Sequence, residues 1–113
     1  MTSQRYSNVE NLLLLGLLDA PEKNETPFTV DPNIFSTRFK KYLAILINKY
    51  IESGEAYLAR YSIENIVDEH ENMQDDWMQI AGSNTSILPI SVLNRYYADL
   101  MKSYNLKIVK GQM

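Results

Sequence analysis

Five carboxylates between residues 68 and 76 are the side chains whose type and spacing come nearest to a chemical site. A hard divalent cation needs about six converging oxygens, and its binding loop usually turns at a glycine. No glycine lies in this segment. The pattern therefore favours a solvated acidic face, which is also suited to docking a basic partner. The five residues are Asp68, Glu69, Glu71, Asp75 and Asp76.

Catalytic chemistry has little support in the sequence. A nucleophilic triad needs a histidine base, and His70, the single histidine, lies between two glutamates in a pattern typical of a solvated helix end. The four glycines are far apart, so no phosphate-binding loop is indicated. The polar surroundings of the carboxylates give no reason for a raised pKa. We therefore expect a protein that is not an enzyme and that uses no cofactor or metal ion.

The chain is rich in tyrosine, with eight residues of this type. Tyrosine is common at protein interfaces because its ring buries a large rigid area while its hydroxyl tolerates water. Tyr96 and Tyr97 are adjacent, so on a helix we expect one of them to be exposed or to contact another chain. We add Tyr96 and Tyr104 to the five carboxylates as candidate partner-binding residues. Base stacking on these rings would need a basic groove, which the sequence does not indicate.

The composition indicates one globular domain. The chain has 113 residues, of which 45% are apolar and 11% aromatic, enough to form a core. It has no cysteine, so disulfides are excluded and the cytoplasm is the expected compartment. The net charge of -3 argues against a domain whose main task is to neutralise phosphates. No direct nucleic-acid specificity is expected.

The leucine-rich segment near the N-terminus predicts a buried helix. Its apolar run from Leu12 to Leu18 is far shorter than the roughly 20 residues that cross a bilayer. Ser7 and Glu10 have the spacing of a capping box, which predicts the helix start. Pro21 predicts its end, because proline cannot extend a helix. No membrane association is expected.

The next segments predict a loop and a long helix. Residues 22–30 are polar and predict an exposed loop of variable length. Asp31 and Pro32 predict a new helix start, and Ser36 or Thr37 could divide this helix by capping a second one. Gly54 has the position of a left-handed C-cap. The apolar stripe of this helix contains Phe35, Phe39, Leu43, Leu46, Ile47, Tyr50 and Ile51. The polar residues off the stripe are Lys40, Lys41, Asn48, Lys49 and Glu52.

The second half of the chain predicts three more helical segments. Residues 55–61 suggest a loop or an irregular helix, and Ser62 is expected to cap a helix over 63–72. A short helix with Trp77 ends at Gly82, and residues 84–87 form a turn. Pro89 opens the last helix, whose apolar seam suits packing on a core or on another chain. The seam consists of Ile90, Leu93, Tyr97, Leu100 and Tyr104.

These segments predict an all-α fold, a compact bundle of five to six helices. We expect a single helical domain over residues 8–109, with flexible ends at 1–7 and 110–113. The sequence does not decide between a monomer and a homo-oligomer.

The order of these landmarks resembles the N-terminal domain of the DnaB family of replicative DNA helicases. That family opens with a Ser-Val-Glu-like start and a Leu-Leu-Gly-x-Leu-Leu helix, and here Asn-Val-Glu at 8–10 leads into Leu-Leu-Gly-Leu-Leu at 14–18. A phenylalanine then precedes a long apolar helix, similar to Phe35. The resemblance covers about residues 8–105 and implies that Gly16 lets a neighbouring helix come close.

Later landmarks are also similar to that family, and two positions depart from it. Gly54, the segment from Ser62 to Val67 and the Tyr97-Ala98 step match its glycine, its capped short helix and its late tyrosine–alanine pair. Lys40 stands where the family often has histidine, and Ala44 where it often has an aromatic residue. The helical hairpin and ATPase domain that follow in the family are not in this sequence.

The resemblance implies a protein-binding module. In the family, these N-terminal heads associate in a collar above the motor ring and dock primase and some helicase loaders. A non-catalytic interaction domain of the DNA replication machinery is therefore our first hypothesis. The alternative is a complete small phage or plasmid replication protein that loads or modulates a host helicase or primase. A small metal-dependent hydrolase is the minor hypothesis from another class.

Overall fold

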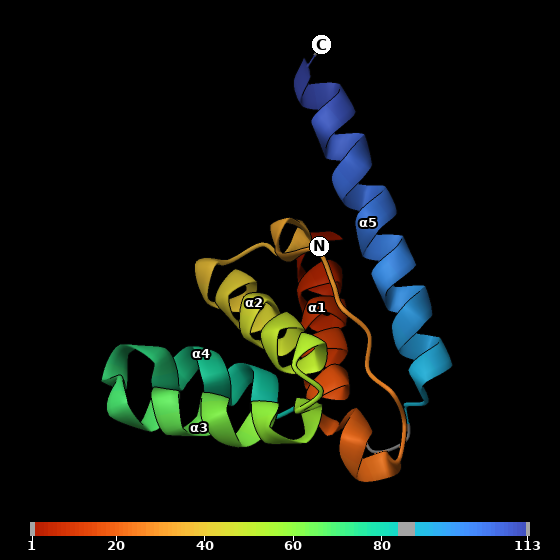
Figure 1. Cartoon of the computed structure of the whole chain (residues 1–113). Helices are drawn as coiled ribbons and strands as arrows, with labels where there is room; N and C mark the ends of the chain where they lie inside the picture. The colour runs from red at the N-terminus through yellow and green to blue at the C-terminus, as the bar shows by residue number, and fades with distance from the viewer. Residues whose placement is uncertain (1, 84–87, 113) are drawn as a thin grey trace.

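The computed structural model describes residues 2–83 and 88–112, and the side chains of residues 8–83 and 88–106. It confirms the all-α prediction, with five α-helices and no strand in this part of the chain (Figure 1). The α-helices are α1 (Thr2–Asp19), α2 (Arg38–Glu52), α3 (Ala59–Glu69), α4 (Glu71–Ala81) and α5 (Ile90–Gln112). Three short 3-10 helices join them, η1 (Ala20–Lys23), η2 (Pro32–Ile34) and η3 (Ala56–Leu58).

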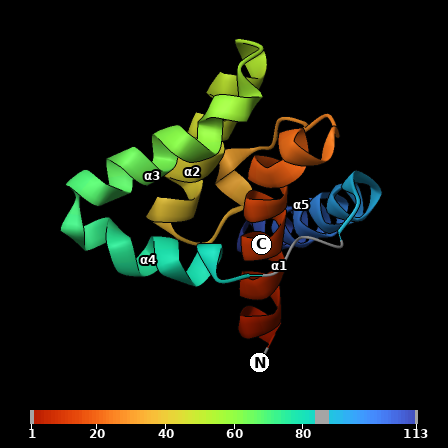
Figure 2. The ribbon, with the colours of Figure 1, turned by 90° about the horizontal axis from the view of Figure 1, so that it is seen from below.

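Helix α1 lies at the centre of the bundle. Helix α5 packs along one side of it, the α3–α4 hairpin lies on the other side, and α2 packs across it (Figure 2). Because neighbours surround α1, its apolar residues are not confined to one face. The leucines that are almost completely buried are Leu13, Leu14, Leu15, Leu17 and Leu18.

The start of α1 differs from the prediction, whereas its end agrees. The helix begins at Thr2 and includes residues that the sequence assigned to a flexible end. Ser7 is therefore inside the helix and is not its N-cap. The Glu10 carboxylate accepts hydrogen bonds from the backbone N–H of Ser36 (2.6 Å) and from its hydroxyl (3.0 Å). The helix ends at Asp19, and Pro21 lies in the first turn of η1.

The close approach expected at Gly16 is present, and the neighbour is α5. A Cβ atom at Gly16 would lie 2.7 Å from both Cδ atoms of Leu93, closer than carbon atoms pack. Leu93 is 1% exposed, so its side chain has little room to move away. The absence of a side chain at Gly16 therefore sets the distance between α1 and α5.

The segment after α1 is not the variable loop that its polar composition predicted. The side-chain amide of Asn48 accepts from Val30 N (2.9 Å) and donates to Val30 O (2.7 Å), as a neighbouring strand would. The next backbone N–H, of Asp31, donates to the Tyr97 hydroxyl (2.9 Å). The rings of Phe28 and Tyr97 pack with their centroids 5.7 Å apart. Long-range contacts fix this loop, and local sequence does not reveal them.

Helix α2 begins after the break that the sequence allowed. Asp31 caps the short η2 helix by accepting from Asn33 N (3.0 Å), and the Thr37 hydroxyl then caps α2 by accepting from Lys40 N (3.2 Å). Gly54 has the predicted left-handed conformation, with φ at 78°. Lys40 lies off the apolar stripe but is only 7% exposed, and it lines a small cavity together with Asp76 and Gln79 of α4.

Helix α3 begins earlier than predicted. It starts at Ala59, after η3 covers residues 56–58, so Ser62 is inside the helix rather than its N-cap. The Ser62 hydroxyl accepts a hydrogen bond from the Tyr50 hydroxyl (2.7 Å) and so ties α3 to α2. His70 lies in extended conformation between α3 and α4, where one continuous helix over 63–72 was expected.

Helix α5 begins after Pro89 as predicted, and the turn predicted at 84–87 lies outside the described residues. Two side chains of the 22–30 segment hold its start. Glu25 accepts from Ile90 N (2.9 Å), and Lys23 Nζ donates to Leu88 O (3.0 Å). Across the described residues, no helix has the length and apolar character needed to cross a bilayer.

Candidate functional site

The α3–α4 hairpin presents the five candidate carboxylates. Asp68 and Glu69 end α3, while Glu71, Asp75 and Asp76 lie in the first half of α4. All five are exposed, because only a narrow apolar edge of each helix faces the core. The buried residues of that edge are Ile63, Val67, Trp77 and Ile80.

Most of this acidic face has no compensating charge. Arg60 forms ion pairs with Asp19 and Glu64, and among the described side chains no ion pair involves the carboxylates at 68, 69, 71 or 75. The described residues also contain no group of three or more acidic or histidine side chains that could hold a metal ion. The hairpin is therefore a spread negative surface, as predicted.

His70 separates the two helices of the hairpin. Its ring is exposed, and Nδ1 lies 2.9 Å from the carbonyl oxygen of Ile66 in the last turn of α3. The backbone N–H of His70 donates to Val67 O at 3.0 Å. The predicted solvated helix end is confirmed, and His70 acts as the joint that reverses the chain.

The fifth carboxylate has a different environment from the other four. Asp76 lines a small polar cavity of about 80 Å³ between α1, α2 and α4, which Asn11, Lys40 and Gln79 also line. Burial lowers the pKa of Lys40 from its ordinary value, and the charges of Glu10 and Asp76 oppose this shift. The buried Asn11 Oδ1 has no hydrogen-bond partner among the described residues. Asp76 thus faces the body of the protein as well as solvent.

The two candidate tyrosines are less accessible than predicted. Tyr96 and Tyr97 are both half-buried against the core, so the expectation that one of them is exposed is wrong. Tyr97 packs against Phe28 and accepts a hydrogen bond from Asp31 N, and Tyr96 packs against the core cluster. Tyr104 is half-buried too. Among the described side chains, the most exposed tyrosines are Tyr57 (68%) and Tyr61 (66%), in the segment whose structure the sequence left open.

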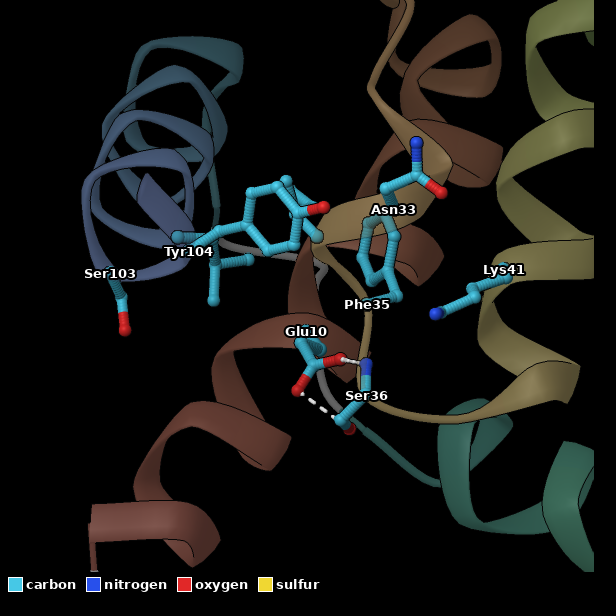
Figure 3. Close-up of a pocket in the computed structure, with 9 residues that line it drawn as sticks. Glu10, Asn33, Phe35, Ser36, Lys41, Ser103 and Tyr104 are labelled. Carbon is cyan, nitrogen blue, oxygen red and sulfur yellow. Dashed lines mark hydrogen bonds between the residues drawn. The ribbon is translucent and has the colours of Figure 1, made fainter. Parts of the chain in front are cut away.

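A larger pocket, of about 340 Å³, lies where α1, η2, the start of α2 and α5 meet (Figure 3). We call it the junction pocket. Its walls come from three segments that are distant in the chain, so no local sequence pattern predicts it. Its lining residues are Glu10, Asn33, Ile34, Phe35, Ser36, Lys41, Leu100, Ser103 and Tyr104.

The polar groups of the junction pocket come from different helices. Glu10, from α1, is 3% exposed and is held by Ser36. Lys41 extends into the pocket from α2, and Tyr104 extends from α5 (Figure 3). Neither Lys41 nor the Tyr104 hydroxyl has a hydrogen-bond or ion-pair partner among the described residues. The Lys41 ammonium and the Tyr104 hydroxyl can therefore donate hydrogen bonds to a ligand from two facing sides of the pocket.

Comparison with known proteins identifies no relative: no family model matches the chain, no curated protein matches it, and no solved structure matches it.

Proposed function

We propose that this chain is a non-catalytic protein-binding domain of the DNA replication machinery, comparable in role to the N-terminal head of a replicative helicase. The surface that binds the partner is the outer face of the α3–α4 hairpin. Its partners are a primase, a helicase or a helicase loader. The replication assignment comes from the resemblance in landmark order at residues 8–105.

One observation supports a docking role above the others. Four exposed carboxylates on the hairpin form no ion pair with the described side chains. A concentrated charge of one sign raises the encounter rate with a partner of opposite sign and selects against partners of like sign. Such a surface contributes little to the fold, so its charge pattern suits recognition.

The hairpin also offers apolar contact area next to these charges. Met78 on α4 is 67% exposed, and methionine adapts to differently shaped partners. Protein interfaces combine an apolar centre with a polar rim. A basic partner surface with a shallow apolar depression would satisfy both features of the hairpin.

Charge reversal tests the docking surface. The hairpin variant carries D68K, E69K, E71K and D75K, and it leaves Asp76 in place because this residue faces Lys40. A control variant reverses four exposed carboxylates elsewhere and therefore has the same net charge. The control changes are E22K, E52K, E55K and D99K.

Affinity capture from the source cells, followed by titration of the captured partner, gives the readout. We expect the wild-type and control chains to capture a replication protein, and the hairpin variant to bind it at least about tenfold more weakly. Equal binding by the hairpin and control variants would contradict the proposal that the hairpin is the docking surface. Capture of partners unconnected with replication would contradict the replication role. It would not contradict the docking role of the hairpin.

A further inference from the structure

We propose that the junction pocket binds a small ligand in which a carboxylate is joined to an apolar group. The carboxylate accepts from Lys41 Nζ and the Tyr104 hydroxyl, and the apolar group packs on Phe35 and Leu100. This site lies at the α5 side of the molecule, away from the α3–α4 hairpin (Figures 1 and 2). The proposal is independent of the replication assignment.

The size and lining of the junction pocket suit such a ligand. Its volume of about 340 Å³ falls in the range of roughly 300–1,000 Å³ that is usual for small-molecule sites. The apolar part of its wall comes from Ile34, Phe35 and Leu100, which are all nearly buried. The wall is therefore fixed by the core, and an apolar group would pack on the exposed edges of these side chains.

The free polar capacity of the pocket favours an acceptor. Lys41 has three N–H donors and Tyr104 one O–H donor, and none of them is used within the described residues. A carboxylate accepts two or more hydrogen bonds at once, and bonds between charged groups are the strongest. Lys41 and Tyr104 would thus satisfy one carboxylate from two sides.

The Glu10 carboxylate lies in the same pocket as Lys41, where Ser36 holds its two oxygens. Each of its carboxylate oxygens already accepts a hydrogen bond from Ser36. Its charge also raises the pKa of Lys40 against the effect of burial. Lys41 forms no ion pair among the described residues, so its ammonium group is available to an anionic ligand.

Binding would join elements that the described hydrogen bonds leave unconnected. Tyr104 and Leu100 belong to α5, and Lys41 belongs to α2. A ligand that contacts all three holds the outer part of α5 against the body. Its occupancy should therefore raise the thermal stability of the protein, because it binds only the folded state.

The first test is a titration of the 15N-labelled chain, followed by NMR, with three probes: N-acetyl-phenylalanine, its carboxamide and acetate. We expect N-acetyl-phenylalanine to shift signals of residues 33–41 and 100–104, and the other two probes to bind at least about tenfold more weakly. Equal shifts with acid and amide, shifts elsewhere on the chain, or no shifts at millimolar concentration would each overturn the proposal.

Two variants and their controls locate the carboxylate. Lys41→Met and Tyr104→Phe should each weaken N-acetyl-phenylalanine binding, by about tenfold for Lys41→Met and less for Tyr104→Phe. Lys49→Met and Tyr42→Phe remove the same groups from exposed positions of α2 outside the pocket and should leave the affinity unchanged. Unaltered affinity in Lys41→Met, with an intact NMR spectrum, would contradict the assignment.

Two further probes distinguish the sources of such a ligand. A pentapeptide that ends in phenylalanine with a free carboxylate represents the end of a protein chain, and 3-phenylpropionate represents a free small acid. Tighter binding of the pentapeptide would assign the pocket to a chain terminus, and tighter binding of 3-phenylpropionate would assign it to a metabolite. If neither probe binds, the proposal that the pocket takes a carboxylate joined to an apolar group is wrong.

Discussion

Helix α1 and the α3–α4 hairpin have opposite relations to solvent. Five leucines of α1 are at most 4% exposed and face several neighbours. The hairpin buries only one edge and exposes five carboxylates and a methionine. Substitutions in α1 should therefore act on the fold, and substitutions on the outer hairpin should act on binding. This small domain therefore keeps the residues that stabilise its core apart from the charged residues on its surface.

The largest expected effect separates these two regions directly. Leu14→Ala should lower the free energy of unfolding by about 3 kcal/mol, because it leaves a cavity at a position with no solvent exposure. Met78→Ala, on the exposed face of the hairpin, should change it by less than about 0.5 kcal/mol. Urea unfolding followed by circular dichroism measures both values. Similar losses in the two variants would contradict the comparison.

The second prediction concerns the contact between α1 and α5. Gly16→Ala should destabilise the protein by about 1–2 kcal/mol, because its Cβ overlaps the confined Leu93 side chain. In a Leu93→Ala background the same change should instead stabilise by about 1 kcal/mol, since alanine is the better helix former. The double-mutant cycle is measured by urea unfolding. The same sign in both backgrounds would show that steric overlap does not govern this position.

The third prediction concerns the 22–30 segment, which belongs to neither region. Asn48→Ala should lower the free energy of unfolding by about 2 kcal/mol. It leaves the backbone N–H and C=O of Val30 without their hydrogen-bond partner, and Val30 is only 4% exposed. Hydrogen exchange of the Val30 amide should accelerate, while amides in the middle of α1 remain protected. Unchanged exchange at Val30 would argue that packing of the segment, rather than Asn48, holds it.

The smallest effect is a pH dependence at Lys40, where the hairpin touches the body. Its pKa is lowered in the folded state, so near that pKa the unfolded chain binds more protons and stability rises with pH. The rise begins near the lowered pKa and ends near the ordinary value of 10.5. Lys40→Met should flatten this part of the profile relative to wild type. Urea unfolding at a series of pH values tests the difference, and parallel profiles would contradict it.

Local signals predicted the helix boundaries where the residue acts on its own backbone. Pro21, Thr37, Gly54 and Pro89 each mark an end or a start for a reason that lies within one helical turn. Ser7 and Ser62 are not caps, because α1 begins at Thr2 and α3 begins at Ala59. The structure places Ser62 opposite the Tyr50 hydroxyl, and that contact spans two helices.

The candidate sites divide in the same way. Exposure of the acidic hairpin followed from composition, since a run of carboxylates is too costly to bury without partners. The junction pocket could not be predicted, because Glu10, Lys41 and Tyr104 are far apart in the chain. The half-burial of both Tyr96 and Tyr97 was also missed. It depends on packing against other parts of the chain, which the pattern of α5 alone does not reveal.

The amino-acid sequence by itself determined an all-α chain, its approximate helix ends and the negative face around residue 70, because helix period, capping and charge are properties of neighbouring residues. Only the tertiary structure decided which polar groups are buried, that Asn48 holds the loop at Val30, and that a pocket opens beside Lys41. Those outcomes depend on contacts between segments that are distant in sequence. Such contacts contribute to stability only when the helices have packed together.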